Sequence, residues 1–288
     1  MEDDIPAAYR AAIAARFPEL AASGLTLLNA GWDSVAVDAD DRLIFKFPRN
    51  ESAALSLRRE ARFLAHLRPR LTLPVPALEL CETPFLFSVH EKLRGEHLVT
   101  AQYAQVSEPA RDRMAAKLAQ FYAELHSQPL KVMQGLGATP IKPWLTPEDI
   151  LARAAPHLEG PMRDFLKRSV AAWAALPPDP FGLTYGFFDG HGWNMAFDHA
   201  SETLNGVYDF ADSGIGALTQ DFIYSDFIST DLTDRIVAHY RRLTARAIDL
   251  DRVRLLSGVL RLTELAQYAD DPAIAGDRLA ALAEWIGR

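Results

Sequence analysis

A polar, glycine-rich loop between two apolar stretches is the strongest candidate for chemistry in this sequence. It runs Asp189-Gly190-His191-Gly192-Trp193-Asn194, between Phe187-Phe188 and Met195-Ala196-Phe197. A loop that only faced solvent would need no such apolar frame. Asp189 is therefore a candidate to accept a proton from an attacking hydroxyl group, or to orient that group. The structural alternative is that Asp189 only closes an Asx turn.

A second carboxylate, Asp209, ends the next short apolar run. If residues 194–198 and 205–209 form an antiparallel hairpin that closes near Ser201-Glu202, Asn194 lies opposite Asp209 and their side chains converge. Amide and carboxylate oxygens are hard ligands, which Mg²⁺ accepts together with phosphate oxygens and water. Asp189 or Asp209 alone is more simply explained as a structural residue, but their joint spacing favours a site with magnesium held by Asn194 and Asp209.

A lysine interrupts an apolar run, Leu43-Ile44-Phe45-Lys46-Phe47, and alternation places it on the face opposite the phenylalanines. Such a lysine usually lies at an exposed edge. However, Glu60 falls on the apolar stripe of the following helix, and a carboxylate that faces a core is costly unless it is paired. We therefore expect Lys46 to pair with Glu60, as in kinases, where such a pair aims the ammonium at nucleotide phosphates. Arg58 and Arg59 are the alternative partners.

A weaker signal is the turn Ala30-Gly31-Trp32-Asp33-Ser34. The backbone there, with Gly31 and the Ser34 hydroxyl, is a candidate to cover phosphates. A plain hairpin turn explains the same residues equally well. The sequence contains no Gly-x-x-x-x-Gly-Lys-Ser/Thr loop, no Gly-x-Ser-x-Gly elbow and no His-Glu-x-x-His pair.

The elements that must position these residues follow from periodicity and from Gly and Pro punctuation. We expect an α+β protein, because strands dominate the first third of the chain and helices the rest. The composition changes near 90–95 and predicts two lobes, residues 1–92 and 93–288. The expected elements are a helix over 5–22, strands at 25–28, 34–37, 43–47 and 85–89, a helix over 51–67, irregular loops at 129–147, a helix over 161–176, a hairpin over 194–209 and mainly helical sequence after it.

Composition sets broad limits on function. Thirty basic and 38 acidic side chains give a formal charge of −8, and 49% of the residues are hydrophobic, which is typical of a soluble globular protein. The single cysteine, Cys81, excludes an intramolecular disulfide and favours a reducing compartment. The acidic amphipathic start predicts no secretory signal, and no apolar run approaches the length of a spanning helix. We therefore expect a cytoplasmic protein that binds neither membrane nor nucleic acid.

Taken together, the ordered motifs resemble the aminoglycoside phosphotransferase family, relatives of the protein and choline kinases. The similarity is collinear over roughly residues 25–225 and is specific as a set. It implies a bilobal protein-kinase-like fold with a small N-terminal antiparallel sheet plus a helix, followed by a larger, mainly helical lobe. The residues that carry it are Gly31-Trp32-Asp33-Ser34, Phe45-Lys46-Phe47-Pro48-Arg49, Glu60, the segment from Ser88 to Gly95, Asp189 to Asn194, and Asp209 to Asp212.

The resemblance also implies roles at the nucleotide. Lys46 would hold the α- and β-phosphates, oriented by Glu60, and Asp189 would be the catalytic carboxylate. Asn194 and Asp209 would bind Mg²⁺. A further set would support the site: residues 90–92, including His90 and Lys92, as the hinge whose backbone meets the base, His191 for packing or loop support, and Asp212 and Asp221 as structural or substrate-side acids.

The implied activity is that of a small-molecule kinase. It would need Mg²⁺ and transfer the γ-phosphate of ATP or GTP to a free hydroxyl of a small molecule, among them aminoglycosides and other cationic compounds. A monomer or weak dimer is expected. Asp226, Glu264, Asp270 and Asp271 are candidates for a cation-binding pocket, although solvated surface charge is their simpler explanation.

Two alternatives remain from the residues. Family members usually carry His-Gly immediately before the catalytic Asp, whereas Phe187-Phe188 stands here. That departure favours a pseudokinase that binds nucleotide without turnover. A metal-dependent hydrolase built on Asp189, His191 and Asp209 is the other alternative, and it would hold a transition metal.

Overall fold

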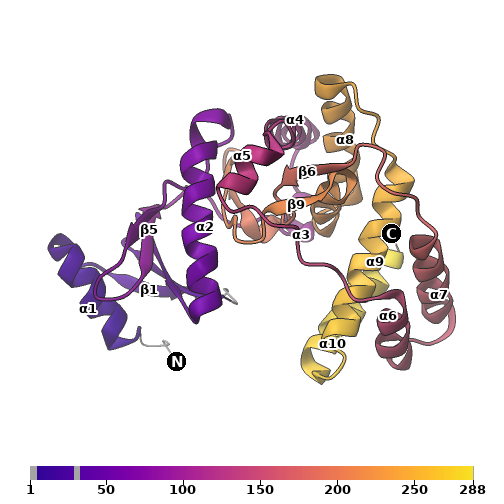
Figure 1. Ribbon diagram of the computed structural model, residues 1–288, viewed down its shortest axis with the longest axis horizontal. Coiled ribbons are helices and arrows are strands. Elements are labelled where there is room, and N and C mark those ends of the chain that lie inside the picture. Colours follow the sequence, from indigo (N-terminus) through magenta and orange to yellow (C-terminus); the bar gives the residue numbers. More distant parts are fainter. Residues whose placement is uncertain (1–4, 29–32, 288) are drawn as a thin grey trace.

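The computed structural model describes residues 5–28 and 33–287, which fold into two lobes (Figure 1). The smaller lobe is built on a five-stranded antiparallel sheet with the strand order β1-β2-β3-β5-β4. Its elements are β1 (Leu25–Leu28), β2 (Ser34–Ala39), β3 (Leu43–Pro48), β4 (Glu79–Cys81), β5 (Phe87–Glu91), α1 (Ala7–Arg16) and α2 (Glu51–Leu67).

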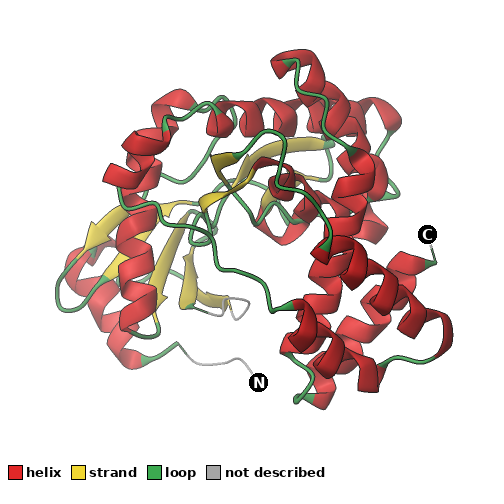
Figure 2. Cartoon of the chain, turned by 45° about the vertical axis from the view of Figure 1, so that its right-hand side comes forward, coloured by secondary structure: helices red, strands yellow, loops and turns green. Residues whose placement is uncertain are grey.

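The larger lobe is mainly helical and contains two short antiparallel strand pairs, β6 with β9 and β7 with β8. In Figure 2 the side of the molecule near the C-terminus consists of helices alone. The elements of this lobe are α3 (Thr100–Tyr103), α4 (Glu108–His126), α5 (Leu130–Gly135), α6 (Pro147–Ala154), α7 (Gly160–Ala174), β6 (Leu183–Gly186), β7 (Met195–Asp198), β8 (Thr203–Val207), β9 (Gly214–Ala217), α8 (Thr230–Thr244), α9 (Leu250–Gln267) and α10 (Pro272–Ile286). The expected α+β class and lobe architecture are confirmed.

Alternation along β3 sorts its side chains between the two faces of the small sheet. Phe45 and Phe47 are buried in an apolar cluster that includes residues of α1. There Phe47 stacks on Tyr9, with the ring centroids 4.1 Å apart. Lys46 points to the other face, because successive side chains of a strand alternate. The lysine is thus directed toward α2 and the larger lobe.

Helix α2 joins the two lobes. It begins where the Asn50 side chain accepts the backbone N–H of Ala53 at 2.9 Å, a favourable N-cap. Its buried face includes Phe63, which belongs to the main core of the larger lobe and packs edge-on against Tyr185 of β6. Glu60 is buried on the same helix, so packing against both lobes fixes its position.

Several elements differ from the sequence-based expectation, and β6 was not expected as a strand. The first helix ends at Arg16 rather than near residue 22, because Phe17 precedes Pro18 and such a residue disfavours the α conformation. Residues 129–147, expected to be irregular, include the short helix α5. The Gly214–Ala217 segment, expected to be helical, forms β9.

Close packing explains the unexpected strand β9. A Cβ atom at Gly216 would lie 2.6 Å from the Phe188 ring and 2.7 Å from the side chain of Ile141. A glycine is therefore required for the strand to approach the chain that precedes Asp189. No helix of the described chain is long and apolar enough to cross a membrane.

Candidate active site

Lys46 lies between two carboxylates from different parts of the chain. Its Nζ is 3.7 Å from Glu60 Oε1 and 3.3 Å from Asp209 Oδ1. The predicted pair with Glu60 is therefore present. The alternative partners are engaged elsewhere, since Arg58 pairs with Glu82 and Arg59 donates to Ser56 Oγ and to the backbone oxygen of Ala211.

Burial and charge act in opposite directions on this group. Burial alone would lower the Lys46 pKa, but the negative charges of Asp209 and Glu60 outweigh it, so the pKa lies above its usual value. Burial raises the pKa of Glu60, and the nearby ammonium offsets part of that rise. Glu60 also accepts the backbone N–H of Phe210 at 3.0 Å. Lys46 is thus a fixed cation at the junction of the lobes.

The loop 189–194 folds back on Asp189. The Asn194 side chain donates to Asp189 Oδ2 at 2.6 Å and to the backbone oxygen of Asp189 at 3.0 Å. His191 Nε2 lies 3.1 Å from Asp189 Oδ1. Burial alone would lower the His191 pKa, but the Asp189 carboxylate raises it above its usual value. Both carboxylate oxygens of Asp189 are therefore held in a defined orientation.

The hairpin that was expected to bring Asn194 opposite Asp209 is present, but its register differs by one residue. Met195 pairs with Val207, and the backbone oxygen of Asn194 accepts the N–H of Tyr208. Asp209 instead follows the strand with φ = 69°, a left-handed conformation that Asp tolerates better than most residues. This bend turns Asp209 toward Lys46, to which its carboxylate bonds.

The oxygen donors present here have the chemistry that Mg²⁺ requires. Because Asn194 uses its amide NH₂ on Asp189, its carbonyl oxygen remains a possible ligand, and Asp209 supplies a carboxylate. Magnesium is commonly held by one or two such groups together with substrate phosphates, so the residues fit that ion. Within residues 5–28 and 33–287, no three His, Cys, Asp or Glu side chains form a metal-binding group.

A further acid, Asp212, contributes to the negative charge of this region. Burial, the largest cause, and the nearby charges of Asp189, Asp209 and Asp33 together raise its pKa to about 6. Several carboxylates thus face one region with Lys46 as a counter-charge. Such a cluster attracts cations.

Asp221 supports the loop from behind, at the Phe187-Phe188 pair that directly precedes Asp189. Its buried carboxylate accepts the backbone N–H groups of Phe187 and Phe188 at 3.0 and 2.5 Å. His126 of α4 lies 3.0 Å from the same carboxylate and 2.9 Å from the Tyr240 hydroxyl. Phe188 has φ = 53°, so this network holds a strained turn directly before Asp189.

We expect Asp221→Asn to lower the free energy of unfolding by about 3 kcal/mol, because it leaves a buried network with mismatched donors. Displacement of the loop should also lower kcat by about 100-fold. Urea unfolding tests the effect on stability. Turnover measured under conditions where both variants remain folded tests the effect on kcat. Asp249→Asn is the matched control: Asp249 also accepts two backbone N–H groups, but at the start of α9, where Asn caps equally well. Equal stability of the two variants contradicts the role given to Asp221.

Sequence reasoning overlooked three side chains near the loop. His126 and Tyr122 lie four residues apart on α4, and the periodicity there indicated only core packing. A Cβ atom at Gly190 would lie 2.2 Å from the Tyr122 hydroxyl, so Tyr122 forms the wall behind the loop. Tyr208 donates its hydroxyl to the backbone oxygen of Trp193 at 2.8 Å. The one sequence signal for a position of Tyr208 near the loop was that it directly precedes Asp209.

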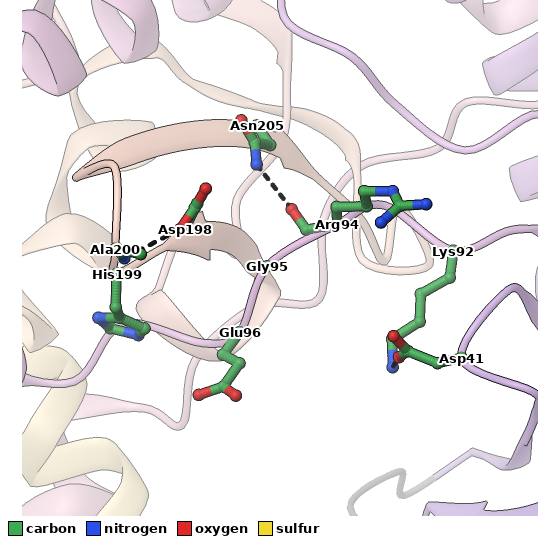
Figure 3. Close-up of a pocket in the computed structure, with 9 residues that line it drawn as sticks. All are labelled: Asp41, Lys92, Arg94, Gly95, Glu96, Asp198, His199, Ala200 and Asn205. Atoms are coloured by element: carbon green, nitrogen blue, oxygen red, sulfur yellow. Dashed lines mark hydrogen bonds and ion pairs between the residues drawn. The ribbon is translucent and has the colours of Figure 1, made fainter.

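The linker after β5 lies beside a cavity of about 480 Å³ (Figure 3). Lys92 extends toward Asp41 there, and its Nζ lies 2.5 Å from Asp41 and 2.6 Å from Asp38. The Lys92 ammonium thus ties the linker to the turn after β2. Its backbone N–H is also engaged, since it donates to Arg42 at 2.8 Å.

His90, the other hinge candidate, is buried on the same face of the sheet as Lys46, two residues along the ladder. Burial lowers the His90 pKa to about 4, so the imidazole is neutral at pH 7 and its Nδ1 bonds to the backbone oxygen of Glu91 at 2.9 Å. Of the two phosphate-loop candidates, Ser34 begins β2 opposite Pro48. Gly31 lies outside the described residues.

Each of the four acids considered for a cationic pocket has a structural partner. Asp226 is buried with Arg261 and Trp285, Asp270 pairs with Arg153, and Asp271 caps α10. Glu264 on α9 differs, because it is close enough to Asp189 and His191 for their charges to act on it. Burial raises the pKa of Glu264, and Arg278 at 3.8 Å offsets part of that rise.

The chain is similar to one known protein family and to several solved structures. The model of the phosphotransferase enzyme family matches residues 24–256. None of the curated protein sequences compared with the chain matches it. Several solved structures share its fold at low sequence identity.

One is the GDP complex of wild-type aminoglycoside 2'-phosphotransferase-IIIa, which is 22% identical over 96% of this chain and 97% of that chain, with a TM-score of 0.81. Another is the apoenzyme of macrolide 2'-phosphotransferase MphH from Brachybacterium faecium, 18% identical over 93% and 98% of the two chains, with a TM-score of 0.66. A third is the kanamycin and GDP complex of APH(2")-IIIa, 20% identical over 97% and 98%, with a TM-score of 0.78. The bilobal kinase-like fold expected from the sequence is therefore confirmed.

Proposed function

Because this chain belongs to the phosphotransferase enzyme family, we propose that it is a Mg²⁺-dependent small-molecule kinase. It transfers the γ-phosphate of ATP or GTP to a hydroxyl group. The observation that carries this proposal is the position of Lys46 Nζ, within 4 Å of both Glu60 and Asp209. A cation so held is suited to grip nucleotide phosphates.

The chain's own residues account for the steps of the transfer. Asp189 orients the acceptor hydroxyl and accepts its proton as the oxygen attacks the γ-phosphorus. The bond from that phosphorus to the β,γ-bridging oxygen breaks, and the nucleoside diphosphate leaves with the electron pair. A Mg²⁺ ion held by Asn194 and Asp209 would neutralise charge on the phosphate oxygens. Lys46 holds the non-transferred phosphates in place.

The backbone contact with the base moves one residue along the chain from the expected 90–92. The Lys92 N–H is already bonded to Arg42, and the backbone oxygen of Glu91 accepts from His90. Leu93 follows, and its N–H has no backbone partner among the residues that the structure describes. We therefore assign to Leu93 the backbone donor that meets the purine base.

One part of the acceptor lies on the α9 side of the 189–194 loop. Glu264 is partly exposed, lies 3.8 Å from Arg278, and is close enough to that loop for the charges of Asp189 and His191 to act on it. Kanamycin and macrolide phosphotransferases share the fold, so hydroxyl-bearing antibiotics with amino groups are the first acceptors to test. An ammonium group of the acceptor would pair with Glu264.

The test is nucleotide consumption by the purified chain with ATP or GTP and Mg²⁺. The panel consists of amino-sugars, macrolides, choline-like amines and neutral sugars, each with and without EDTA. We expect acceptor-dependent release of ADP or GDP that EDTA abolishes. Nucleotide binding without acceptor-dependent turnover for any member would instead favour the pseudokinase. Turnover without nucleotide would favour a hydrolase.

A further inference from the structure

An exposed tryptophan stands in the middle of the candidate catalytic loop. Trp193 is 56% exposed and is the exposed one among the tryptophans in the described part of the chain. It directly precedes Asn194, whose side chain touches Asp189. The exposed aromatic residue is therefore the direct neighbour in the chain of a residue in the proposed reaction centre.

The ring is held in place, unlike an ordinary surface side chain. One face of Trp193 stacks on the His97 imidazole, with the centroids 4.1 Å apart and the planes inclined by 27°. Its backbone oxygen accepts the Tyr208 hydroxyl at 2.8 Å. The preceding residue is anchored too, because Leu98 donates its N–H to the oxygen of Gly192. A side chain ordered in this way loses little conformational entropy when a ligand binds.

The anchors locate the ring at the boundary between the linker and the loop. His97 lies on the segment that leads from β5 into the larger lobe, and Tyr208 immediately precedes Asp209. The Tyr208 pKa, raised by burial, also responds to the charges of Asp209 and Lys46. Tyr208 thus connects Trp193 to the group of residues that would hold the phosphates.

We propose that Trp193 forms a wall of the acceptor subsite and packs against an amine-bearing ring of the acceptor, with His97 as the support behind it. The inference rests on the proposed kinase function, because it assumes that the acceptor hydroxyl lies at Asp189. The chemistry follows from the ring and from the charge of the candidate active site. An indole face attracts organic cations, and the carboxylates of Asp189, Asp209 and Asp212, which lie close enough to act on one another, give that site a negative charge that favours the same ligands.

The test measures binding separately from turnover. Isothermal titration of the full chain with kanamycin, an amine-bearing glycoside, is compared among wild type, Trp193→Ala and Trp193→Phe. We expect Trp193→Ala to weaken the kanamycin Kd about tenfold and Trp193→Phe to retain most of the affinity, because a phenyl ring still presents an aromatic face. The Kd for Mg²⁺-nucleotide should stay within about twofold.

Leu243→Ala is the matched control, since Leu243 is a similarly exposed apolar side chain near the end of α8. It should bind kanamycin as wild type does. Three results overturn the inference: no kanamycin binding by wild type, equal affinity in wild type and Trp193→Ala, or a loss confined to the nucleotide Kd. Loss of kanamycin affinity in Trp193→Ala, in a chain that shows no turnover with any acceptor, would support the subsite while rejecting the kinase function.

Discussion

Replacement of Asp189 by Asn should lower kcat by about 1,000-fold or more, within the range that a general base contributes to catalysis. Asn has nearly the same shape and keeps an acceptor oxygen, but it cannot take a proton. In the protein, Asp189 is held from both sides by Asn194 and His191. The substitution therefore removes the proton acceptor. The introduced amide oxygen can still accept the Asn194 NH₂, and the introduced NH₂ can donate to Nε2 of a neutral His191 imidazole, so the loop should stay in place. Asp189→Ala should be at least as damaging.

The measurement is steady-state turnover with the best acceptor of the panel, together with thermal unfolding of each variant. The nucleotide Kd should change little, because Asp189 is assigned to the hydroxyl and not to the phosphates. His191→Gln is an informative companion, since Gln still donates to Asp189 but carries no charge. Its kcat should fall by less than that of Asp189→Asn. Wild-type-like turnover by either Asp189 variant would remove this residue from the mechanism.

Local sequence patterns were sufficient where a single strand or helix determined the outcome. Alternation placed Lys46 opposite Phe45, and helical spacing placed Glu60 on the buried face of α2. The cost of an unpaired buried carboxylate then predicted their ion pair. In such cases a buried charged side chain needs a partner of opposite charge, and only a few residues in the neighbouring elements can provide one.

The sequence could not reveal contacts that depend on tertiary packing between distant segments. His126 and Asp221 are 95 positions apart, and no local pattern links a histidine on α4 to the turn before Asp189. The register of the hairpin was also missed. The expected pairing puts Asn205 opposite Asp198, whereas Thr203 pairs there, and a bulge after Ala196 reduces the offset to one residue at Met195; alternation encodes neither the turn nor the bulge. Despite the different register, Asp209 lies beside Lys46, because its left-handed backbone conformation turns the carboxylate toward the lysine.

Asp209→Asn should abolish the Mg²⁺ dependence of nucleotide binding and lower kcat by about 1,000-fold. Asparagine tolerates the left-handed conformation at this position, so the backbone should keep its course. The substitution removes a negative charge that serves both as a proposed metal ligand and as the partner of Lys46 at 3.3 Å. Loss of that charge weakens the hold on Mg²⁺, because carboxylates bind this hard cation through their charge.

Nucleotide Kd values with Mg²⁺ and with EDTA distinguish this role from a purely structural one. Wild type should bind nucleotide more tightly with Mg²⁺, whereas Asp209→Asn should show equal affinity in both conditions. Glu60→Gln provides the matched control: it removes the other carboxylate near Lys46, at 3.7 Å, without touching a proposed metal ligand. It should weaken nucleotide binding yet keep the response to Mg²⁺. If Asp209→Asn retained that response, Asp209 would act only through Lys46, and the metal would have to be held elsewhere.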